Sequence, residues 1–356
     1  MKYIIIFPNK NQLKIIEKYK EKDILIVDKK DKIEKIILDK NTKVLCCHEE
    51  GIYWLKSNID VNMKINFSEE CLEMTNKWNA YQIFKRREIP CVYKTRKVEE
   101  IKKFPIVAKP NIGFGSIGVK KINNSKLLKE YIKKFDTMME QSVVAEDKER
   151  FFKNEKNFPI FEECIEDGQF FSVPFFVDNN KEIKIYPVMG IRKEDTKVSN
   201  YKWATFLYGK NILDDIVLEK IKNVISRIVN NWIIEPSVNL VEMIYSDEDK
   251  EFKVLEFSPR IVGGRITKMI EYALGINLDE ISLELFFGER QLQTKEKYNK
   301  ITVVDICNID IDGNEVTSYE PNKLADYRLV EVEEIQSPIG QNKIRYKIFE
   351  KESGPI

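Results

Sequence analysis

The stretch Val254-Leu-Glu256-Phe-Ser258-Pro-Arg260 carries a carboxylate, a hydroxyl and a guanidinium at alternate positions after an apolar start. Side chains two positions apart on a strand lie on the same face, so these three are predicted to share one face at a strand end. Glu242 lies on the preceding apolar run, and the polar stretch Ser246-Asp-Glu-Asp249 between the two runs predicts a hairpin turn. Such a hairpin would bring Glu242 beside Glu256.

Two carboxylates aimed at one point repel each other unless a cation lies between them. Mg²⁺ prefers oxygen ligands and binds them together with substrate phosphates, so Glu242, Glu256 and Ser258 are candidate metal ligands. A guanidinium offers paired donors that fit a phosphoryl group, which makes Arg260 a candidate catalytic residue. The alternative is an ordinary surface hairpin with an arginine–glutamate ion pair.

A glycine-rich motif, Gly113-Phe-Gly115-Ser116-Ile-Gly118, follows the strand-like run Phe104-Pro-Ile-Val-Ala-Lys109-Pro110. The motif matches the pattern of NAD-binding folds, but those need a helix after the third glycine, and Val119–Ile122 is β-like. A protein-kinase interpretation lacks the His-Arg-Asp and Asp-Phe-Gly elements. When only the loop sequence is considered, a flexible turn that binds no ligand is the alternative interpretation. Beside the carboxylate pair, the motif favours a hairpin that folds over nucleotide phosphates with backbone N–H donors.

These motifs together resemble the ATP-grasp superfamily, which includes D-alanine–D-alanine ligase, biotin carboxylase and the synthetase halves of carbamoyl-phosphate synthase. The resemblance covers roughly residues 1–300 in the order of elements. Its specific parts are Val107-Ala-Lys109-Pro with the glycine hairpin, Glu162-Glu163-Cys164-Ile165, and Glu256-Phe-Ser258-Pro-Arg260 with the pair Gly263-Gly264.

The resemblance implies ATP and Mg²⁺ (or Mn²⁺) as cofactors and assigns a role to each matching residue. Lys77 and Lys109 would contact the phosphates, and a hinge would read adenine through the main chains of Glu163 and Ile165. Glu242 and Glu256 would bind the metal, and Arg260 would lie at the reacting phosphate. The other positions expected at the nucleotide are Gly113, Gly115, Ser116, Gly118, Glu162 and Gln169.

Two further cations are candidates for chemistry, each with an alternative. Lys202, in the loop Ser199-Asn-Tyr-Lys-Trp203, would reach the γ-phosphate, or else is a solvated loop lysine. Arg265, after the glycine pair, would hold a substrate carboxylate, or else caps a helix or forms an ion pair.

Two positions depart from the family pattern. Ser258 stands where the family often has asparagine, and a hydroxyl is a weaker oxygen ligand. Gln169 stands where an acid usually holds the ribose hydroxyls, unless the register is shifted by one. Neither departure removes the metal pair or the phosphate lysines, so catalysis is still expected.

The expected fold class is α/β with an α+β lid. Tyr3–Phe7, Ile24–Val27 and Val44–Cys47 alternate with helical patterns, as in a doubly wound parallel sheet. The implied ATP-grasp layout is a Rossmann-like domain over residues 1–73, an ATP-grasp domain with a central antiparallel sheet over 74–300, a glycine-hairpin lid within it over about 104–163, and a β-rich C-terminal appendage over 301–356.

The activity implied by the resemblance is the ATP-dependent joining of a carboxylate to an amine through an acyl phosphate, with ADP and phosphate as products. The substrates would be small metabolites or amino acids. A bicarbonate-activating or nucleotide-precursor synthetase of the same superfamily is one alternative, and an ATP-binding sensor with a degenerate site is another. The sequence names neither the acid nor the amine, and it leaves a homodimer open.

The composition argues against several other classes of protein and of active site. Fifty-nine Lys+Arg against 58 Asp+Glu give a net charge of +1, which provides no broad attraction to nucleic acid or to an anionic membrane. No apolar run approaches the length of a membrane-spanning helix. The six cysteines show no paired metal spacing and are expected as reduced thiols of a cytoplasmic protein. The single histidine, His48, leaves little room for a histidine-rich metal site or a catalytic triad.

Overall fold

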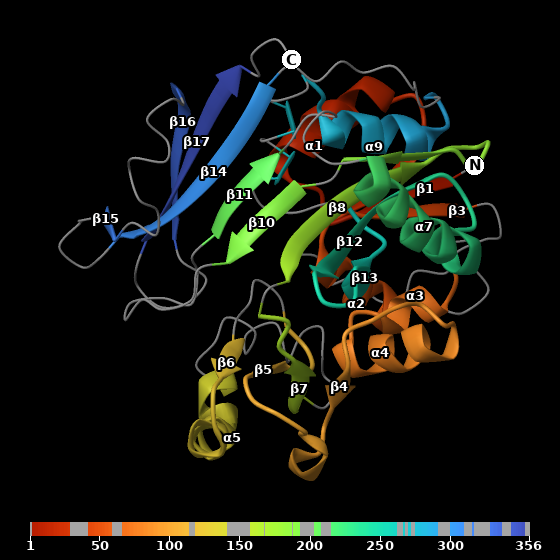
Figure 1. Cartoon of the computed structure of the whole chain (residues 1–356). Helices are drawn as coiled ribbons and strands as arrows, with labels where there is room; N and C mark the ends of the chain where they lie inside the picture. Colours follow the sequence, from red (N-terminus) through yellow and green to blue (C-terminus); the bar gives the residue numbers. More distant parts are fainter. Residues whose placement is uncertain are drawn as a thin grey trace.

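The computed structural model divides the chain among three sheets (Figure 1). The described residues are 2–28, 42–58, 66–113, 118–140, 157–166, 168–186, 188–192, 203–207, 215–261, 266–267, 270–271, 275–290, 300–309, 315–316, 328–336 and 343–352. For 188–192, 203–207 and the strands from residue 300 onward, the description covers the backbone.

The N-terminal sheet is parallel, with the strand order β2-β1-β3. Its strands are β1 (Lys2–Ile6), β2 (Asp23–Val27) and β3 (Thr42–Cys46), so the three predicted strands are confirmed, with ends at most two residues from the expected positions. The connecting elements are α1 (Lys10–Ile16), η1 (Glu17–Tyr19) and α2 (Glu49–Asn58); the predicted helical pattern at Ile33–Ile37 lies outside the described residues. Because α2 follows β3 directly, its first residue, Glu49, stands at the carboxyl edge of this sheet.

Two helices lead to the second sheet. They are α3 (Glu70–Glu73) and α4 (Lys77–Arg86), separated at Thr75-Asn76. The sequence pattern Ser68-Glu-Glu70 predicts a helix with Ser68 as its N-cap, whereas in the structure the N-cap of α3 is Glu69. Asn76 caps α4, since its side chain accepts a hydrogen bond from the backbone N–H of Asn79 at 3.0 Å.

The second sheet is small and antiparallel, with the order β4-β7-β5-β6, and it forms the lower lobe of Figure 1. We call this lobe the lid. Its strands are β4 (Lys94–Thr95), β5 (Ile106–Pro110), β6 (Lys120–Ile122) and β7 (Pro159–Glu163), with the short helix η2 (Val98–Glu100) after β4.

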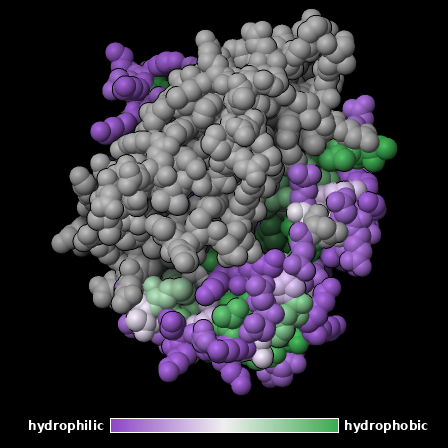
Figure 2. Space-filling model, turned by 60° about the vertical axis from the view of Figure 1, so that its left-hand side comes forward, coloured by the Kyte–Doolittle hydropathy of each residue, from purple (hydrophilic) through white to green (hydrophobic). Residues whose placement is uncertain are grey.

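Helix α5 (Ser125–Glu140) packs on one face of the lid sheet. Leu128, Tyr131 and Phe135 recur at helical spacing and are buried in one cluster with Ala108 and Phe161 of the sheet. Each such buried side chain contributes roughly 1.5–3 kcal/mol. Figure 2 shows hydrophilic side chains over most of the visible surface of this lobe, with small apolar patches between them. The opposite face of the lid sheet, which carries Lys109 and Glu162, is therefore left for the site.

The central sheet has the order β13-β12-β8-β10-β11-β14-β17-β16. Helix α7 (Asp215–Trp232) contacts β13 and buries residues that recur at helical spacing, and α9 (Leu278–Phe287) lies against β12 and α1. The strands up to the hairpin are β8 (Gln169–Val177), β9 (Ile183–Ile185), β10 (Val188–Arg192), β11 (Trp203–Leu207), β12 (Ser237–Ser246) and β13 (Glu251–Ser258).

The C-terminal strands continue the central sheet. They are β14 (Lys300–Ile309), β15 (Glu315–Val316), β16 (Arg328–Gln336) and β17 (Lys343–Glu352), and β14 pairs with β11 from Ala204↔Asp305 to Leu207↔Thr302. The expected β-rich C-terminal segment is thus present and is hydrogen-bonded to the sheet before it. The domain boundaries of the preceding section remain predictions.

Candidate active site

Three strands of the central sheet place polar side chains in one row. In the register, Glu242 of β12 pairs with Glu256 of β13 on one side and with Ser172 of β8 on the other. The neighbouring row on the same face contains Phe170, Ile244 and Lys253. The predicted hairpin therefore does bring the two glutamates together.

The hairpin also contains an irregularity that the sequence did not indicate. The register shifts between Glu242 and Met243, so that Leu255 has no pairing partner on β12. Strand β13 ends at Ser258, which is buried, and the backbone N–H of Arg260 donates to the carbonyl of Ser258 at 2.9 Å in the bend that follows. The sequence predicted that strand alternation places Arg260 on the face of Glu256. In the structure the strand has ended before Arg260, and the bend decides its position.

Lys77 projects from the first turn of α4 toward this row. Its ammonium lies 3.9 Å from Glu256 Oε2 and donates to the carbonyl of Gly113 at 2.5 Å. The backbone N–H of Lys77 donates to the carbonyl of Asn111, which docks the helix on the loop after β5. Burial alone would lower the pKa of Lys77, but the carboxylates around it, foremost Glu256, outweigh burial and raise it. Lys77 is therefore held as a cation.

The lid sheet contributes a second cluster of charges. Lys109 Nζ lies 2.7 Å from Glu162 Oε1, and Lys94 Nζ lies 2.5 Å from the same oxygen. Burial lowers the pKa of Lys109 to about 8, although Glu162 acts in the opposite direction. Burial would raise the pKa of Glu162, but the two lysines outweigh it and hold that pKa at about 2. Glu162 is thus an anion shared by two cations.

Arg260 meets a carboxylate from the N-terminal sheet. Its Nη2 donates to Glu49 Oε2 at 3.1 Å, and its Nη1 donates to the carbonyl of Ile261 at 2.9 Å. Glu49 is buried, and burial together with the nearby Glu256 raises its pKa to about 6. Glu49 Oε1 and Arg260 Nε are buried without a hydrogen-bond partner in the described part of the chain. The pair therefore keeps one acceptor and one donor for another group.

The predicted hinge residues lie between the lid and the central sheet. The backbone N–H of Glu163 donates to the carbonyl of Tyr93 at 3.1 Å, and the carbonyl of Ile165 accepts from Gly168 at 3.2 Å. Gln169, the predicted ribose residue, is exposed and pairs with Tyr245, so strand alternation puts it on the face opposite Ser172. Phe170 occupies the next position on the site face. The structure thus brings Glu162 to the lysines but does not bring Gln169 to the glutamates.

Only the ends of the glycine loop are described. Gly113 and Gly118 have positive φ values of 148° and 74°. A Cβ on Gly118 would lie 2.8 Å from Pro110 Cγ, so this position requires glycine both for its conformation and for its contact. Gly115, Ser116, Lys202 and Arg265 lie outside the described residues, as do Gly263 and Gly264.

Three site residues were missed by the sequence analysis. They are Lys94, Glu49 and Ser172, and all three are buried. Glu49 follows the predicted strand ending at Cys47, and its place at the carboxyl edge of a parallel sheet was a usable signal. Lys94 and Ser172 carried none, because only the pairing of distant strands shows where they point.

The described residues carry few features of other kinds of site. No helix among them is long and apolar enough to cross a membrane. No group of three or more His, Cys, Asp or Glu side chains suited to a metal ion occurs among them. The cysteines whose side chains are described (Cys46, Cys47, Cys71, Cys91 and Cys164) are not disulfide-bonded.

Residues 102–269 match the family model described as an ATP-grasp domain. The chain contains an ATP-grasp domain. The match includes β5, β6 and β7 of the lid and the glutamate hairpin but begins after β4, and the whole chain has the ATP-grasp fold, as its similarity to solved structures shows. No curated protein sequence matches the chain.

Three similar solved structures cover nearly the whole chain. An L-amino acid ligase from Bacillus licheniformis is 13% identical with a TM-score of 0.62, over 99% of this chain and 94% of that one. A carboxyaminoimidazole ribonucleotide synthase from Aspergillus clavatus, complexed with ATP, is 11% identical with a TM-score of 0.62 over the same shares. A biotin carboxylase complex with β,γ-ATP from Campylobacter jejuni is 11% identical with a TM-score of 0.61, over 99% and 87%.

The ATP-grasp site fits a magnesium–nucleotide ligand. Its unpartnered buried polar atoms include Ser172 Oγ in the glutamate row, Glu49 Oε1 and Arg260 Nε. Leaving such atoms unpaired costs about 1–3 kcal/mol each, which a polar ligand offsets. Mg²⁺ is commonly held by one or two protein carboxylates together with substrate phosphates. Cations on one side and paired carboxylates on the other match that requirement.

Proposed function

We propose that the chain is an ATP-dependent ligase that activates a small-molecule carboxylate as an acyl phosphate and joins it to an amine, with ADP and phosphate as products. The observation that carries the proposal is the approach of Lys77 to Glu256, which pairs with Glu242 across the hairpin. This arrangement, in an ATP-grasp domain, suits a triphosphate between cations and a metal held by carboxylates.

The proposal assigns binding roles to residues on both sides of the site. Lys77 and Lys109 would hold phosphate oxygens, and Glu242, Glu256 and Ser258 would hold Mg²⁺. The metal, when bound, supplies neutralisation of phosphate charge. The glycine loop, whose described ends Gly113 and Gly118 have positive φ, would close over the phosphates and exclude water. The hinge roles of Glu163 and Ile165 and the roles of Gln169, Lys202 and Arg265 remain predictions.

A site of this kind depends on electrostatic stabilisation more than on a protein nucleophile. An amine does not displace oxide from a carboxylate, whereas phosphate leaves readily from an acyl phosphate. The transferring phosphoryl group and the tetrahedral intermediate both concentrate negative charge. Arg260 would stabilise that charge, and Glu49 holds Arg260 in position through its carboxylate. The proposal therefore requires no protein nucleophile.

The similar structures support the reaction class and leave the substrate open. The L-amino acid ligase is the neighbour whose name fits a carboxylate–amine ligase. Biotin carboxylase and carboxyaminoimidazole ribonucleotide synthase are neighbours of comparable similarity, so a bicarbonate-activating or nucleotide-precursor synthetase is the second candidate. The two candidates differ in the acid that is phosphorylated.

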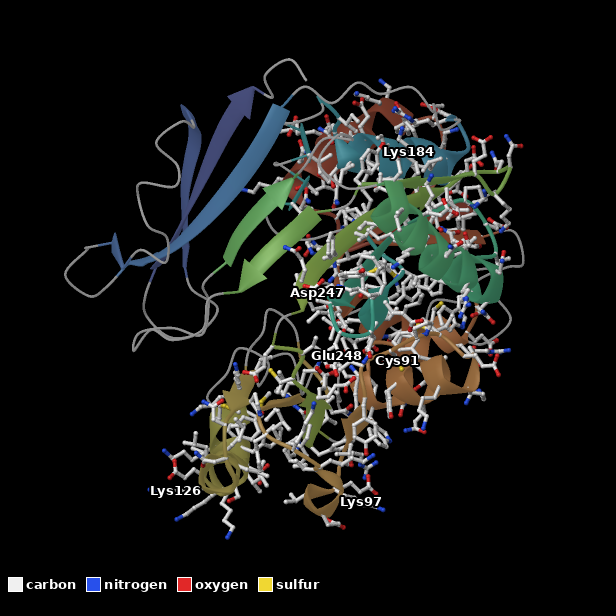
Figure 3. All side chains as sticks on the ribbon, in the orientation of Figure 1. Cys91, Lys97, Lys126, Lys184, Asp247 and Glu248 are labelled. Carbon is white, nitrogen blue, oxygen red and sulfur yellow. The ribbon has the colours of Figure 1, made fainter. Side chains whose placement is uncertain are left out.

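The test is ADP release with Mg·ATP across a panel of amino acids and small acids, supplied singly and in pairs. The proposed ligase is expected to release ADP only when an acid and an amine are both present. Release that depends on bicarbonate would replace it with the second candidate. Nucleotide binding without ADP release across the panel would favour a sensor with a degenerate site. Glu256→Gln should slow ADP release by about 10²–10³-fold, whereas Lys126→Met, on the exposed face of α5, should not change it (Figure 3).

A further inference from the structure

Lys94 is a buried lysine to which none of the roles above is assigned. Its side chain has no exposed surface, and burying an ammonium is costly unless it is paired and hydrogen-bonded. It lies on β4, a two-residue strand at the edge of the lid sheet, where it pairs in register with Glu162 of β7. Packing alone does not explain a buried ammonium group at this position, because an apolar side chain would fill the space without the cost of burying a charge.

One carboxylate oxygen connects Lys94 to the phosphate lysine. Glu162 Oε1 lies 2.5 Å from Lys94 Nζ and 2.7 Å from Lys109 Nζ. The two lysines come from β4 and β5, which flank β7 on either side. Without Lys94, the carboxylate of Glu162 would pair with Lys109 alone and neutralise it. With Lys94 present, the three groups together carry a net positive charge.

The same ammonium also contacts the central sheet. Lys94 Nζ donates to the carbonyl of Leu255 at 3.0 Å, and Leu255 is the residue that has no partner on β12. The segment Pro90–Val92, which leads into the lid, lies beside β13. The backbone N–H of Val254 donates to the carbonyl of Pro90, and the carbonyl of Val254 accepts from the backbone N–H of Val92. Lys94 therefore links the lid cluster to the strand position next to Glu256.

We propose that Lys94 is a positioning residue of the phosphate subsite, which holds Lys109 through Glu162 and fixes this cluster to β13 beside Glu256. The inference rests on the proposed function, because it takes Lys109 as a phosphate ligand. Lys94 keeps the Lys109 ammonium oriented and incompletely neutralised, so that it attracts phosphate. The residue acts through others and touches no nucleotide itself.

The test is the dissociation constant of Mg·ATP, measured by titration calorimetry on the full chain. Lys94→Met is expected to weaken binding by about 10-fold or more, as for truncation of one partner in a buried charge pair. Lys94→Arg should recover most of the affinity, because a guanidinium donates to a carboxylate and a carbonyl at once. Equal affinity of Lys94→Met and wild type would overturn the proposal.

Lys97→Met is the matched control. Lys97 lies three positions further on and pairs with Glu100, but its side chain is 65% exposed. Figure 3 shows the chain passing from Cys91, near the central sheet, to Lys97 at the far end of the lid. Mg·ATP affinity is expected to be unchanged in Lys97→Met, and a loss equal to that of Lys94→Met would contradict a specific role for Lys94.

A double-mutant cycle separates positioning from a merely structural role. If Lys94 acts through Lys109, adding Lys94→Met to Lys109→Met should weaken binding by less than about 3-fold more, because coupled residues are not additive. Fully additive losses would overturn the proposal. If Lys94→Met does not fold, Mg·ATP affinity can instead be compared between Glu162→Gln and the double variant Glu162→Gln/Lys94→Met. The double variant lacks both the ammonium of Lys94 and the carboxylate of Glu162, so neither charge is left buried without the other.

The wild type separates this proposal from the proposed function. Absence of Mg·ATP binding by the folded wild-type chain would refute the ATP site and, with it, the role of Lys94. Binding by the wild type that is insensitive to Lys94→Met would refute only the role of Lys94.

Discussion

Arg260 Nη2 lies 3.1 Å from Glu49 Oε2, so the residue predicted to face the reacting phosphate is held by a carboxylate from the N-terminal sheet. The two side chains are 14% and 6% exposed, so their pairing takes place largely out of water. Removing one partner of a buried pair leaves the other charge uncompensated. Variants of Arg260 therefore affect stability and activity at once.

The first prediction separates these two effects. Arg260→Met is expected to destabilise the fold by about 3–5 kcal/mol, because it leaves Glu49 buried and unpaired. Arg260→Met combined with Glu49→Gln should recover much of that loss while activity remains absent. Urea unfolding and ADP release on the same samples check the prediction. A double variant as unstable as the single one would show that the pair is not the source of the effect.

The second prediction concerns turnover. Lys109→Met and Glu256→Gln are each expected to lower kcat by about 10²–10³, the loss typical of one key electrostatic contact in a transition state. Steady-state kinetics with an active acid and amine pair is the measurement, with a thermal melt to verify folding. Undiminished turnover in variants that melt like the wild type would remove both residues from the proposed machinery.

The third prediction concerns ligand linkage. Mg·ATP at 100 times its Kd should stabilise the folded chain by about 2.7 kcal/mol and raise Tm accordingly. Chelation of the metal with EDTA, or the change Glu242→Gln, should reduce the shift, because the carboxylate pair acts through the metal. Scanning calorimetry with and without nucleotide checks this. An equal shift after chelation would mean that the nucleotide binds without Mg²⁺.

The fourth prediction is a pH dependence with two opposite signs. Burial lowers the pKa of Lys109 to about 8, in a site that also contains Glu162, Lys94, Lys77 and Glu256. Above about pH 8 the ammonium loses its proton, so Mg·ATP affinity should fall by about 10-fold per pH unit.

Stability should change in the other direction over the same range. Because the folded-state pKa of Lys109 lies below the value of about 10.4 for an unfolded chain, the unfolded chain binds more protons between these pH values. The contribution of Lys109 to the free energy of unfolding should therefore increase as pH rises through 8. Lys109→Arg, which stays charged, should lose both effects. A flat affinity profile in the wild type would refute the assignment of Lys109.

The fifth prediction tests the end of the glycine loop. Gly118→Ala places a Cβ 2.8 Å from Pro110 Cγ at a φ of 74°, and it should destabilise the fold by roughly 1–3 kcal/mol more than φ strain alone. Gly288→Ala is the matched control, because its φ is 77° and a Cβ there meets nothing within 4 Å. Urea unfolding of both variants decides. Equal destabilisation would show that Pro110 yields to the added methyl group.

Local patterns were enough to predict most of the elements. The hairpin of Glu242 and Glu256 followed from two apolar runs around a polar turn. These features depend on residues close together in the chain, whose periodicity and turn chemistry can be read directly. The hairpin pairing confirmed in the structure is the part of the site that needed no long-range information.

Other features depend on which distant strands pair. The continuation of the central sheet by β14 arises from pairing with β11, almost a hundred residues away in sequence. Gln169 lies on the face opposite Ser172 because the two residues are three positions apart on β8, where successive side chains alternate between faces. A shift of one residue moves every side chain to the other face, so composition alone does not reveal it.

The sequence by itself determined the kind of groups available: two carboxylates facing each other across a hairpin, a glycine-rich loop after a lysine, and an α/β order of elements. Only the tertiary structure decided which charges meet. It joined Lys94 to Glu162 and Arg260 to Glu49, pairs from segments that lie far apart along the chain. The physical reason is that a side chain's type is local, whereas its burial and its partners are set by the packing of distant strands against one another.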